Sequence, residues 1–296
     1  MTMRREDLAR AMYVGTKEVF KKNIKALPEQ EWKSACTIKT SDKAQETYDT
    51  IGNLKPAHEK EEEGSVEYGK LEQAYRTTII NKTWANGIKF TMEVKEDEQW
   101  NVIPEAKVSE LARTMMQLRE RKVAEVWDNT QVSTGGDGVA YAAVNHPLLH
   151  SASVNSNLKT GVLDFTNYDI CVKAFNAWKS HWGEVFDTKA DTILLHRNYQ
   201  TYFQALMASN LKPFESSNTK NTIPQLKPVF NRYIAELPVY FIDSTIDSAV
   251  FQKRKGLTTE YDYDKRFTFN FYFNVHERYE TGMINPGYGF VKLTGA

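Results

Sequence analysis

One uninterrupted helical pattern, from Pro104 to Thr130, sets the strongest limit on how this chain folds. Proline suits the first turn of a helix, and neither glycine nor proline follows before Gly135. At a rise of 1.5 Å per residue, about 25 residues give a rod of roughly 37 Å, which is long for a helix in a globular domain. Its apolar stripe would contain Val108, Leu111, Ala112, Met115, Leu118, Val123, Val126 and Trp127.

A second strong pattern is the alternation of apolar and polar residues in KRFTFNFYFNV, residues 265–275. This period is typical of a strand with one buried face. The apolar face would carry Phe267, Phe269, Phe271, Phe273 and Val275, and the opposite face Thr268, Asn270, Tyr272 and Asn274. Helical spacing over residues 5–27 and strand-like runs at 192–196 and 230–243 complete the pattern of an α+β chain.

The composition excludes several classes of protein. The 296 residues include 38 basic and 38 acidic side chains, so no overall field attracts nucleic acid. No run approaches 18 consecutive apolar residues, and MTMRREDLAR lacks the apolar centre of a signal peptide, so we expect no membrane contact. Cys36 and Cys171 lack metal or redox spacing, which indicates free thiols in a reducing compartment.

The charge is nevertheless uneven along the chain. Residues 1–27 contain seven basic side chains, among them Arg4, Arg5, Lys21 and Lys22. Residues 59–72 contain six glutamates. Such runs are usually solvated faces, and electrostatic pairing between subunits is the alternative interpretation.

Residues 48–95 form a long polar segment with too few apolar side chains for a core of its own. Its second part, AYRTTIINKTWANGIKFTMEV, favours strand, with Asn86-Gly87 as a turn or bulge. We therefore expect contacts from outside the segment to hold it in place.

The same segment contains GSVEYGKL, residues 64–71, one position short of a phosphate-binding loop. The preceding HEKEEE cannot be a buried strand, and Leu71 stands where the magnesium-binding hydroxyl is required. We interpret Gly64 and Gly69 as turn residues of a charged surface loop. A nucleotide-binding enzyme is the alternative that only this motif supports.

No other pattern indicates catalysis or metal binding. His58-Glu59 is followed by Glu62 where the second histidine of a zinc motif is needed, and Pro147 separates His146 from His150. The GGDG run at 135–138 lacks the strand-then-helix setting of a dinucleotide loop. We therefore predict no catalytic residue, no metal and no cofactor, and a chain that is not an enzyme.

The order of these elements resembles the major capsid protein of tailed bacteriophages, the Hong Kong-type shell fold, and most closely the Mu-type major head subunits. Three stretches carry the resemblance: the N-terminal helix leading into ETYDTIGNLKPAHEK, the INKTWANGIKFTMEV strand ahead of the acidic EDEQ, and the GDGVAYAAVNHP loop ahead of a helix and TILLH. The likeness covers nearly the whole chain and depends mostly on the order and spacing of these motifs.

The resemblance implies a division of the chain. Residues 1–47 would be the N-terminal arm and residues 48–95 an extended loop over a neighbouring subunit. Residues 96–130 and 251–296 would form the peripheral domain with its long spine helix, and residues 131–250 the axial domain.

The function it implies is a major capsid protein that assembles into hexamers and pentamers of an icosahedral head in the virion. Partners would be other copies, a separate scaffold, a portal, decoration proteins and packaged double-stranded DNA bound without sequence specificity. We expect assembly in the host cytoplasm and no long cleaved scaffolding segment on this chain. A cargo-holding nanocompartment shell of similar fold is the alternative.

Within that shell, the strand portion from Tyr75 to Val94 would lie on a neighbour's peripheral domain. Its apolar anchors would be Trp84, Ile88 and Phe90. The acidic candidates are Glu59, Glu61, Glu62 and Glu63, and the basic residues that they would face on another subunit's arm include Arg4, Arg5, Lys21 and Lys22.

Overall fold

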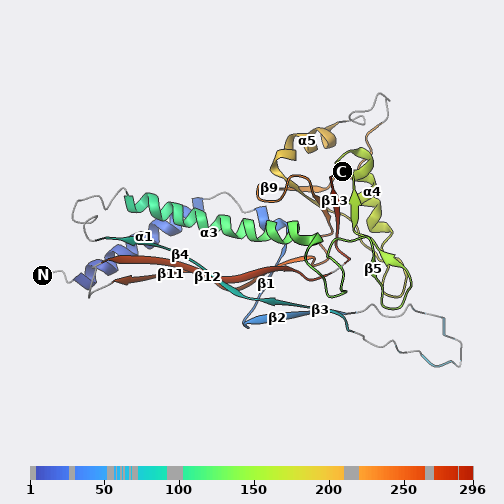
Figure 1. Ribbon diagram of the computed structural model, residues 1–296, viewed down its shortest axis with the longest axis horizontal. Helices are drawn as coiled ribbons and strands as arrows, with labels where there is room; N and C mark the ends of the chain where they lie inside the picture. Colours follow the sequence, from blue (N-terminus) through green and yellow to red (C-terminus); the bar gives the residue numbers. More distant parts are fainter. Residues whose placement is uncertain are drawn as a thin grey trace.

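A long helix lies along a sheet in this protein, and a second sheet stands at one end of that layer (Figure 1). The helix is α3 (Ile103–Asp128), whose bounds confirm the helix predicted from the sequence. The structure is a computed structural model. It describes residues 5–26, 31–51, 57, 59, 60, 62, 64–66, 68, 73–91, 103–209, 220–263, 270–285 and 287–295.

The sheet under α3 has four strands in the order β1-β11-β12-β4. Their bounds are Thr37–Thr40 for β1, Ala249–Tyr263 for β11, Phe271–Met283 for β12 and Lys82–Phe90 for β4. β1 runs parallel to β11, and the other two pairs are antiparallel. β12 is therefore a central strand, flanked by partners more than 180 residues earlier on one side and by the preceding strand on the other.

β12 confirms the predicted alternation where the structure describes it. Phe271, Phe273 and Val275 are at most 3% exposed and pack in one cluster with the first half of α3. Asn270 was expected on the exposed face; it precedes the strand and is buried. Residues 267–269 of the predicted series lie outside the described part.

The inward face of β12 continues beyond the phenylalanines with a charged residue. Glu277 keeps only 2% of its side chain exposed, and its carboxylate accepts hydrogen bonds from the guanidinium of Arg119 on α3. Arg119 Nε lies 3.0 Å from Glu277 Oε2. This pair joins the long helix to the sheet at a position where the sequence pattern led only to apolar contacts.

The first part of the chain packs on its own sheet. Phe20 of α1 (Arg5–Ala26) is 1% exposed and meets Phe273 with a centroid distance of 5.9 Å. After it, η1 (Glu31–Ser34) buries Trp32 against Phe251. The described part of the predicted N-terminal arm is thus integrated into the subunit core.

Glu120 of α3 connects this N-terminal segment to the second sheet. Burial is the main cause that raises the pKa of its carboxyl to about 7, and backbone hydrogen bonds at Trp32 and Glu31 oppose that shift. Asn231 also donates to Glu120 Oε2, over 3.1 Å.

A raised pKa in the folded state means that Glu120 costs stability as pH rises from its ordinary range to about 7, and that the full cost applies above pH 7. Glu120→Gln, which imitates the protonated acid, is expected to raise the free energy of unfolding above pH 7 by about 1–2 kcal/mol, because solvent screens part of the effect at this half-buried carboxyl, with little change near pH 4. Urea denaturation at both pH values measures this. Glu125→Gln, at an exposed position on the same helix, is the control.

The second sheet has five strands in the order β7-β13-β10-β8-β9. Their bounds are Leu158–Thr160 for β7, Phe290–Thr294 for β13, Val239–Ile242 for β10, Thr192–His196 for β8 and Lys227–Asn231 for β9. α4 (Phe165–Asn176) and α5 (Gln200–Ala208) pack with it around one cluster that includes Phe175, Phe203 and Phe241.

One expectation about this region was wrong. The run 230–243 is not one strand, because β9 ends at Asn231, whose side chain accepts a hydrogen bond from the backbone N–H of Tyr233 in a tight turn. β13, near the end of the chain, pairs with β10 and β7 in this five-stranded sheet.

The end of α3 joins the two sheets. Trp127 is 1% exposed and contacts Tyr240 of β10 and Phe290 of β13, with centroid distances of 5.0 and 5.4 Å. Its indole N–H donates to the carbonyl of Ala35, 3.0 Å away. The sheets thus share one core around this tryptophan.

Candidate assembly surfaces

A two-stranded ribbon projects from the four-stranded sheet. It consists of β2 (Gln45–Ile51) and β3 (Gln73–Ile80), paired antiparallel from Gln45↔Ile80 to Ile51↔Gln73, and lies below that sheet in Figure 1. Across the ribbon, Arg76 Nε donates to Asp49 Oδ1 over 2.7 Å. Among the described strands β3 pairs only with β2, so the ribbon depends on contacts at its ends for its position.

The base of the ribbon is fixed to the first sheet by polar side chains. Tyr48 donates its hydroxyl to Gln252 of β11, and Gln252 donates to the carbonyl of Ile79, over 3.0 and 3.3 Å. At the β3–β4 corner, buried Asn81 donates to Ser41 Oγ and to the carbonyl of Lys43. These bonds fix the direction in which the ribbon leaves the four-stranded sheet.

The far part of β3 touches loops that belong to the second sheet. Tyr75 donates its hydroxyl to the carbonyl of Pro147 over 3.0 Å. A Cβ added at Gly136 would lie 3.0 Å from the Cβ of Tyr75 and 3.1 Å from the carbonyl oxygen of Arg76. The GGDG run therefore serves a close backbone approach to the ribbon, in which a side chain at residue 136 would require the ribbon to shift.

A buried polar network holds that loop in shape. His146 Nδ1 lies 2.7 Å from Asp137 Oδ2, and both side chains are at most 3% exposed. His146 Nε2 lies 3.1 Å from Asn157 Oδ1, whose amide is oriented by hydrogen bonds to Ala143 N–H and the Tyr141 carbonyl. Asp137 and Asn157 thus fix the His146 ring from both of its nitrogens.

The loop between β2 and β3 carries the acidic candidates. Glu59 and Glu62 are exposed, whereas Glu61 and Glu63 lie outside the described residues. Val66 and Tyr68 in the same loop are 55% and 89% exposed. This loop therefore presents carboxylates next to two large apolar side chains that its own chain leaves in solvent.

The basic candidates lie on the first helix. Lys21 and Lys22 are exposed on α1, and Arg5 is its first residue. Arg4 lies outside the described residues. Whether these residues meet a neighbour's glutamates stays a prediction.

The three apolar candidates are in β4, and contacts from outside residues 48–95, within the same subunit, hold each of them. Phe90 is 4% exposed and stacks on Phe271 at 6.2 Å. Trp84 is half-buried and donates its indole N–H to the carbonyl of Tyr279 over 3.1 Å. Ile88 is half-buried as well and packs on the same core as Phe90. Phe90 is thus an internal anchor of β4, and a contact of the other two with a neighbour stays a prediction.

Residues 86 and 87 also differ from expectation. They lie inside β4, where Asn86 pairs with Val275 and Gly87 with Asn274, so they form no turn. A Cβ at Gly87 would lie 2.3 Å from Asn274 Oδ1, which gives the glycine a packing reason. The break between β3 and β4 lies instead at Asn81.

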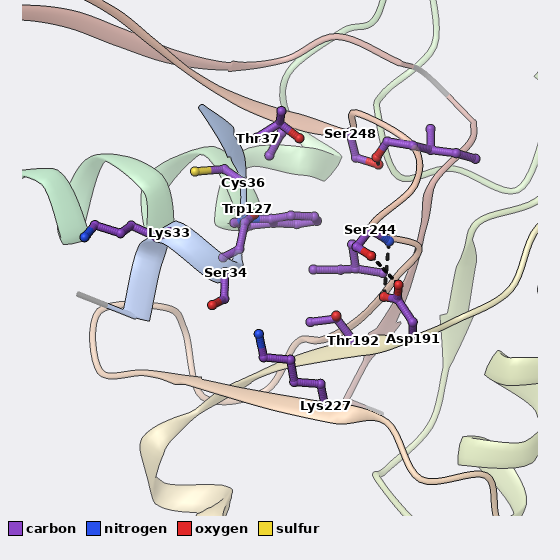
Figure 2. Close-up of a pocket in the computed structure, with 14 residues that line it drawn as sticks. Lys33, Ser34, Cys36, Thr37, Trp127, Asp191, Thr192, Lys227, Ser244 and Ser248 are labelled. Atoms are coloured by element: carbon purple, nitrogen blue, oxygen red, sulfur yellow. Dashed lines mark hydrogen bonds between the residues drawn. The ribbon is translucent and has the colours of Figure 1, made fainter. Parts of the chain in front are cut away.

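A pocket of about 430 Å³ opens where η1, the end of α3 and the second sheet meet (Figure 2). Asp191 in this pocket accepts hydrogen bonds from the backbone N–H and the hydroxyl of Ser244. Burial raises the pKa of the Cys36 thiol to about 12, so this pocket cysteine stays protonated and is a poor nucleophile. The lysines Lys33 and Lys227 are exposed at the same pocket.

The described residues contain neither a metal-binding cluster nor a membrane-spanning helix. Within the described ranges, no three His, Cys, Asp or Glu side chains come close enough together to hold a metal ion. No helix in the part of the chain that the structure describes combines the length and the apolar character needed to cross a membrane.

The family model of the Mu-like prophage major head subunit gpT matches residues 9–170, more than half of the chain. The chain belongs to this family. The match spans α1, the ribbon, α3 and the loop network of Asp137 and His146.

Among curated proteins, the Mu-like prophage FluMu major head subunit of Haemophilus influenzae is 26% identical over 172 residues. The match covers 58% of this chain and 54% of that relative, so the chain spans about half the length of the curated protein it matches.

Two solved structures show the fold of this family member. The procapsid of bacteriophage JBD30 matches with a TM-score of 0.55 at 13% identity, over 97% of this chain and 75% of the other. A virus-like particle from Pyrococcus furiosus matches with a TM-score of 0.55 at 9% identity, over 95% and 98%. The Hong Kong-type shell fold expected from the sequence is confirmed.

Sequence reasoning missed the contacts of Tyr75, Gly136 and Asp137. The available signal was the GGDG run itself, because clustered glycines indicate close backbone approach as well as phosphate binding. What the run approaches cannot be read from the sequence, since β3 lies about 60 residues earlier.

Proposed function

We propose that this chain is the major capsid protein of a phage head, and that its copies assemble into hexamers and pentamers of an icosahedral shell around double-stranded DNA. The family match over residues 9–170 is the observation that supports this most. Sedimentation of the expressed chain tests it: megadalton particles are expected, and a discrete small species as the sole product under all assembly conditions would contradict it.

On this proposal the two sheets take different places in a capsomer. α3 with the four-stranded sheet forms the peripheral domain, and the five-stranded sheet with α4 and α5 forms the axial domain. The ribbon and its loop are the extended loop that lies over a neighbour. This assignment differs from the division expected from the sequence at two places. Residues 82–90 belong to the peripheral domain and residues 290–294 to the axial domain, because their strands pair there.

The same proposal includes partners that no contact in a single chain tests. They are a separate scaffold, a portal, decoration proteins and DNA bound without sequence readout, with assembly in the host cytoplasm. The equal numbers of basic and acidic residues support DNA packaging without a dedicated binding groove. We propose no catalytic activity for the chain.

A cargo-holding shell is the second candidate, supported by the fold match to the Pyrococcus furiosus particle. The contents of purified particles separate the two candidates. Nucleic acid protected from nuclease inside particles from phage-producing cells supports the head, and a tightly held protein cargo without DNA supports the alternative.

Replacing Glu59, Glu61, Glu62 and Glu63 with glutamine is expected to leave the subunit folded but to shift the salt dependence of assembly. Each exposed ion pair contributes only about 0.2–1 kcal/mol and is screened by salt, but the contacts repeat over the whole shell. Light scattering against ionic strength measures the shift.

The matched control for these substitutions has the same change in net charge at four exposed positions elsewhere: Asp42→Asn, Glu184→Gln, Asp187→Asn and Glu260→Gln.

Trp84→Ala, which would otherwise test an apolar anchor, also removes contacts within the subunit. Tyr68→Ser at its 89% exposed position is the cleaner probe and should weaken assembly without changing the melting temperature of the free subunit. Parent-like assembly of the quadruple glutamine variant and of Tyr68→Ser at every ionic strength would show that the loop is no contact.

A further inference from the structure

We propose that Tyr75 and His181 form a pH-sensitive latch that holds the β2–β3 ribbon against its own subunit and releases it on acidification. The role of this latch in assembly rests on the function proposed above, in which the ribbon lies over a neighbouring subunit.

Tyr75 is the ribbon's side of the latch. Its hydroxyl bonds to the carbonyl of Pro147, and its ring meets the His181 ring edge-on at a centroid distance of 5.7 Å. His181 also meets the ring of Tyr288 edge-on at 5.8 Å. Tyr288 in turn donates to the carbonyl of Lys179 over 3.0 Å. His181, the other side of the latch, is thus held by loops that belong to the five-stranded sheet.

His181 is poorly placed to accept a proton. The residue is 1% exposed, and its buried Nδ1 has no hydrogen-bond partner among the residues that the structure describes. A protonated ring would place a positive charge at a buried site and a donor at Nδ1, for which the described residues offer no acceptor.

The titratable groups around His181 do not favour its charged form. His150 lies on the adjacent loop, where its backbone N–H bonds to the His181 carbonyl and its ring stacks on Trp182. Tyr75 and Tyr288 are the neighbours from the other two elements, and burial raises the pKa of both phenols. On its own segment, Lys179 directs its ammonium to Ser153, and the Glu184 backbone carbonyl bonds to Ser180 N–H.

The direction of the pH effect follows from this environment. Burial lowers the pKa of His181, and the neighbouring charge of His150 lowers it further. A group whose pKa is lower in the docked state stabilises docking of the ribbon fully above the ordinary histidine pKa of about 6.5. This stabilisation is lost as the pH falls below that value. The latch is therefore closed at neutral pH and weakens on acidification.

Hydrogen exchange of the unassembled subunit tests the latch independently of assembly. Protection factors of amides in residues 73–80 are compared at about pH 7.5 and pH 5. A protection factor already corrects for the intrinsic pH dependence of exchange. We expect a several-fold loss of protection in the parent at the lower pH. His181→Phe keeps an aromatic ring without a titrating nitrogen and should abolish that loss, while the control His276→Gln, at a histidine on β12, should keep it.

Two results would overturn the proposal: equal protection of the parent ribbon at both pH values, or the same loss in His181→Phe as in the parent. Tyr75→Ala decides the case where His181→Phe fails to fold. It should lower protection of the remaining ribbon amides at neutral pH and remove their acid response, and parent-like exchange at both pH values would contradict the latch.

Discussion

Replacing Arg119 with leucine is expected to lower the free energy of unfolding of the subunit by about 3–5 kcal/mol, because the carboxylate of Glu277 would remain buried without its partner. Glu277 is 2% exposed on the inward face of β12, so water cannot replace the guanidinium. Urea denaturation of the unassembled subunit, followed by tryptophan fluorescence, measures the change.

Two further variants make this prediction specific. Arg113→Leu removes the partner of Glu110 on the same helix, but that pair is exposed, so we expect a loss of less than about 1 kcal/mol. The double variant Arg119→Leu with Glu277→Leu should recover much of the stability, since apolar residues of similar size can replace a buried ion pair. A double variant as unstable as Arg119→Leu alone would show that the loss comes from packing of the arginine stem.

The sequence patterns predicted best what depends on neighbours along the chain. The bounds of α3 follow from Pro104 and an unbroken apolar stripe, and the alternation of β12 follows from a period of two. Both are local properties, so no knowledge of the partner element was needed.

What could not be predicted depends on pairing between distant segments. Tyr75 to Val94 has one composition throughout, yet β3 pairs with β2 in the ribbon, and β4 pairs with β12 about 190 residues later. The division occurs at Asn81, whose side chain bonds to Ser41 and Lys43, and nothing in the local pattern identifies that asparagine. Trp84 and Phe90 were therefore expected to need a neighbouring subunit, although β12 and α3 supply their contacts.

The candidate site shows the same limit. The charge of the loop glutamates and of α1 is visible in the sequence, and Glu59, Glu62, Lys21 and Lys22 are exposed as a surface role requires. The residues that position the ribbon were not visible, because Tyr75, Gly136 and His181 come from three separate parts of the chain.

The buried pair Asp137 and His146 carries the second large prediction. Asp137→Ala is expected to destabilise the subunit by about 1–3 kcal/mol, because it leaves a buried nitrogen of the His146 ring without its hydrogen-bond partner. It also removes the acceptor for the Val139 backbone N–H, which shapes the loop that approaches β3. Asp42→Ala, at an exposed position, is the control and should change the stability little.

The loop's contact with the ribbon gives this variant a second readout. Gly136 is next to Asp137 and lies against the backbone of Arg76, so a loop that loses its network should loosen its hold on β3. We expect hydrogen exchange of residues 73–80 to increase in Asp137→Ala at neutral pH, beyond the increase that its lower global stability explains. A double-mutant cycle with His146→Ala separates the two effects: the stability losses should be strongly non-additive, since either substitution breaks the same bond. Additive losses, or ribbon exchange that follows global stability alone, would show that the network neither acts as one unit nor reaches the ribbon.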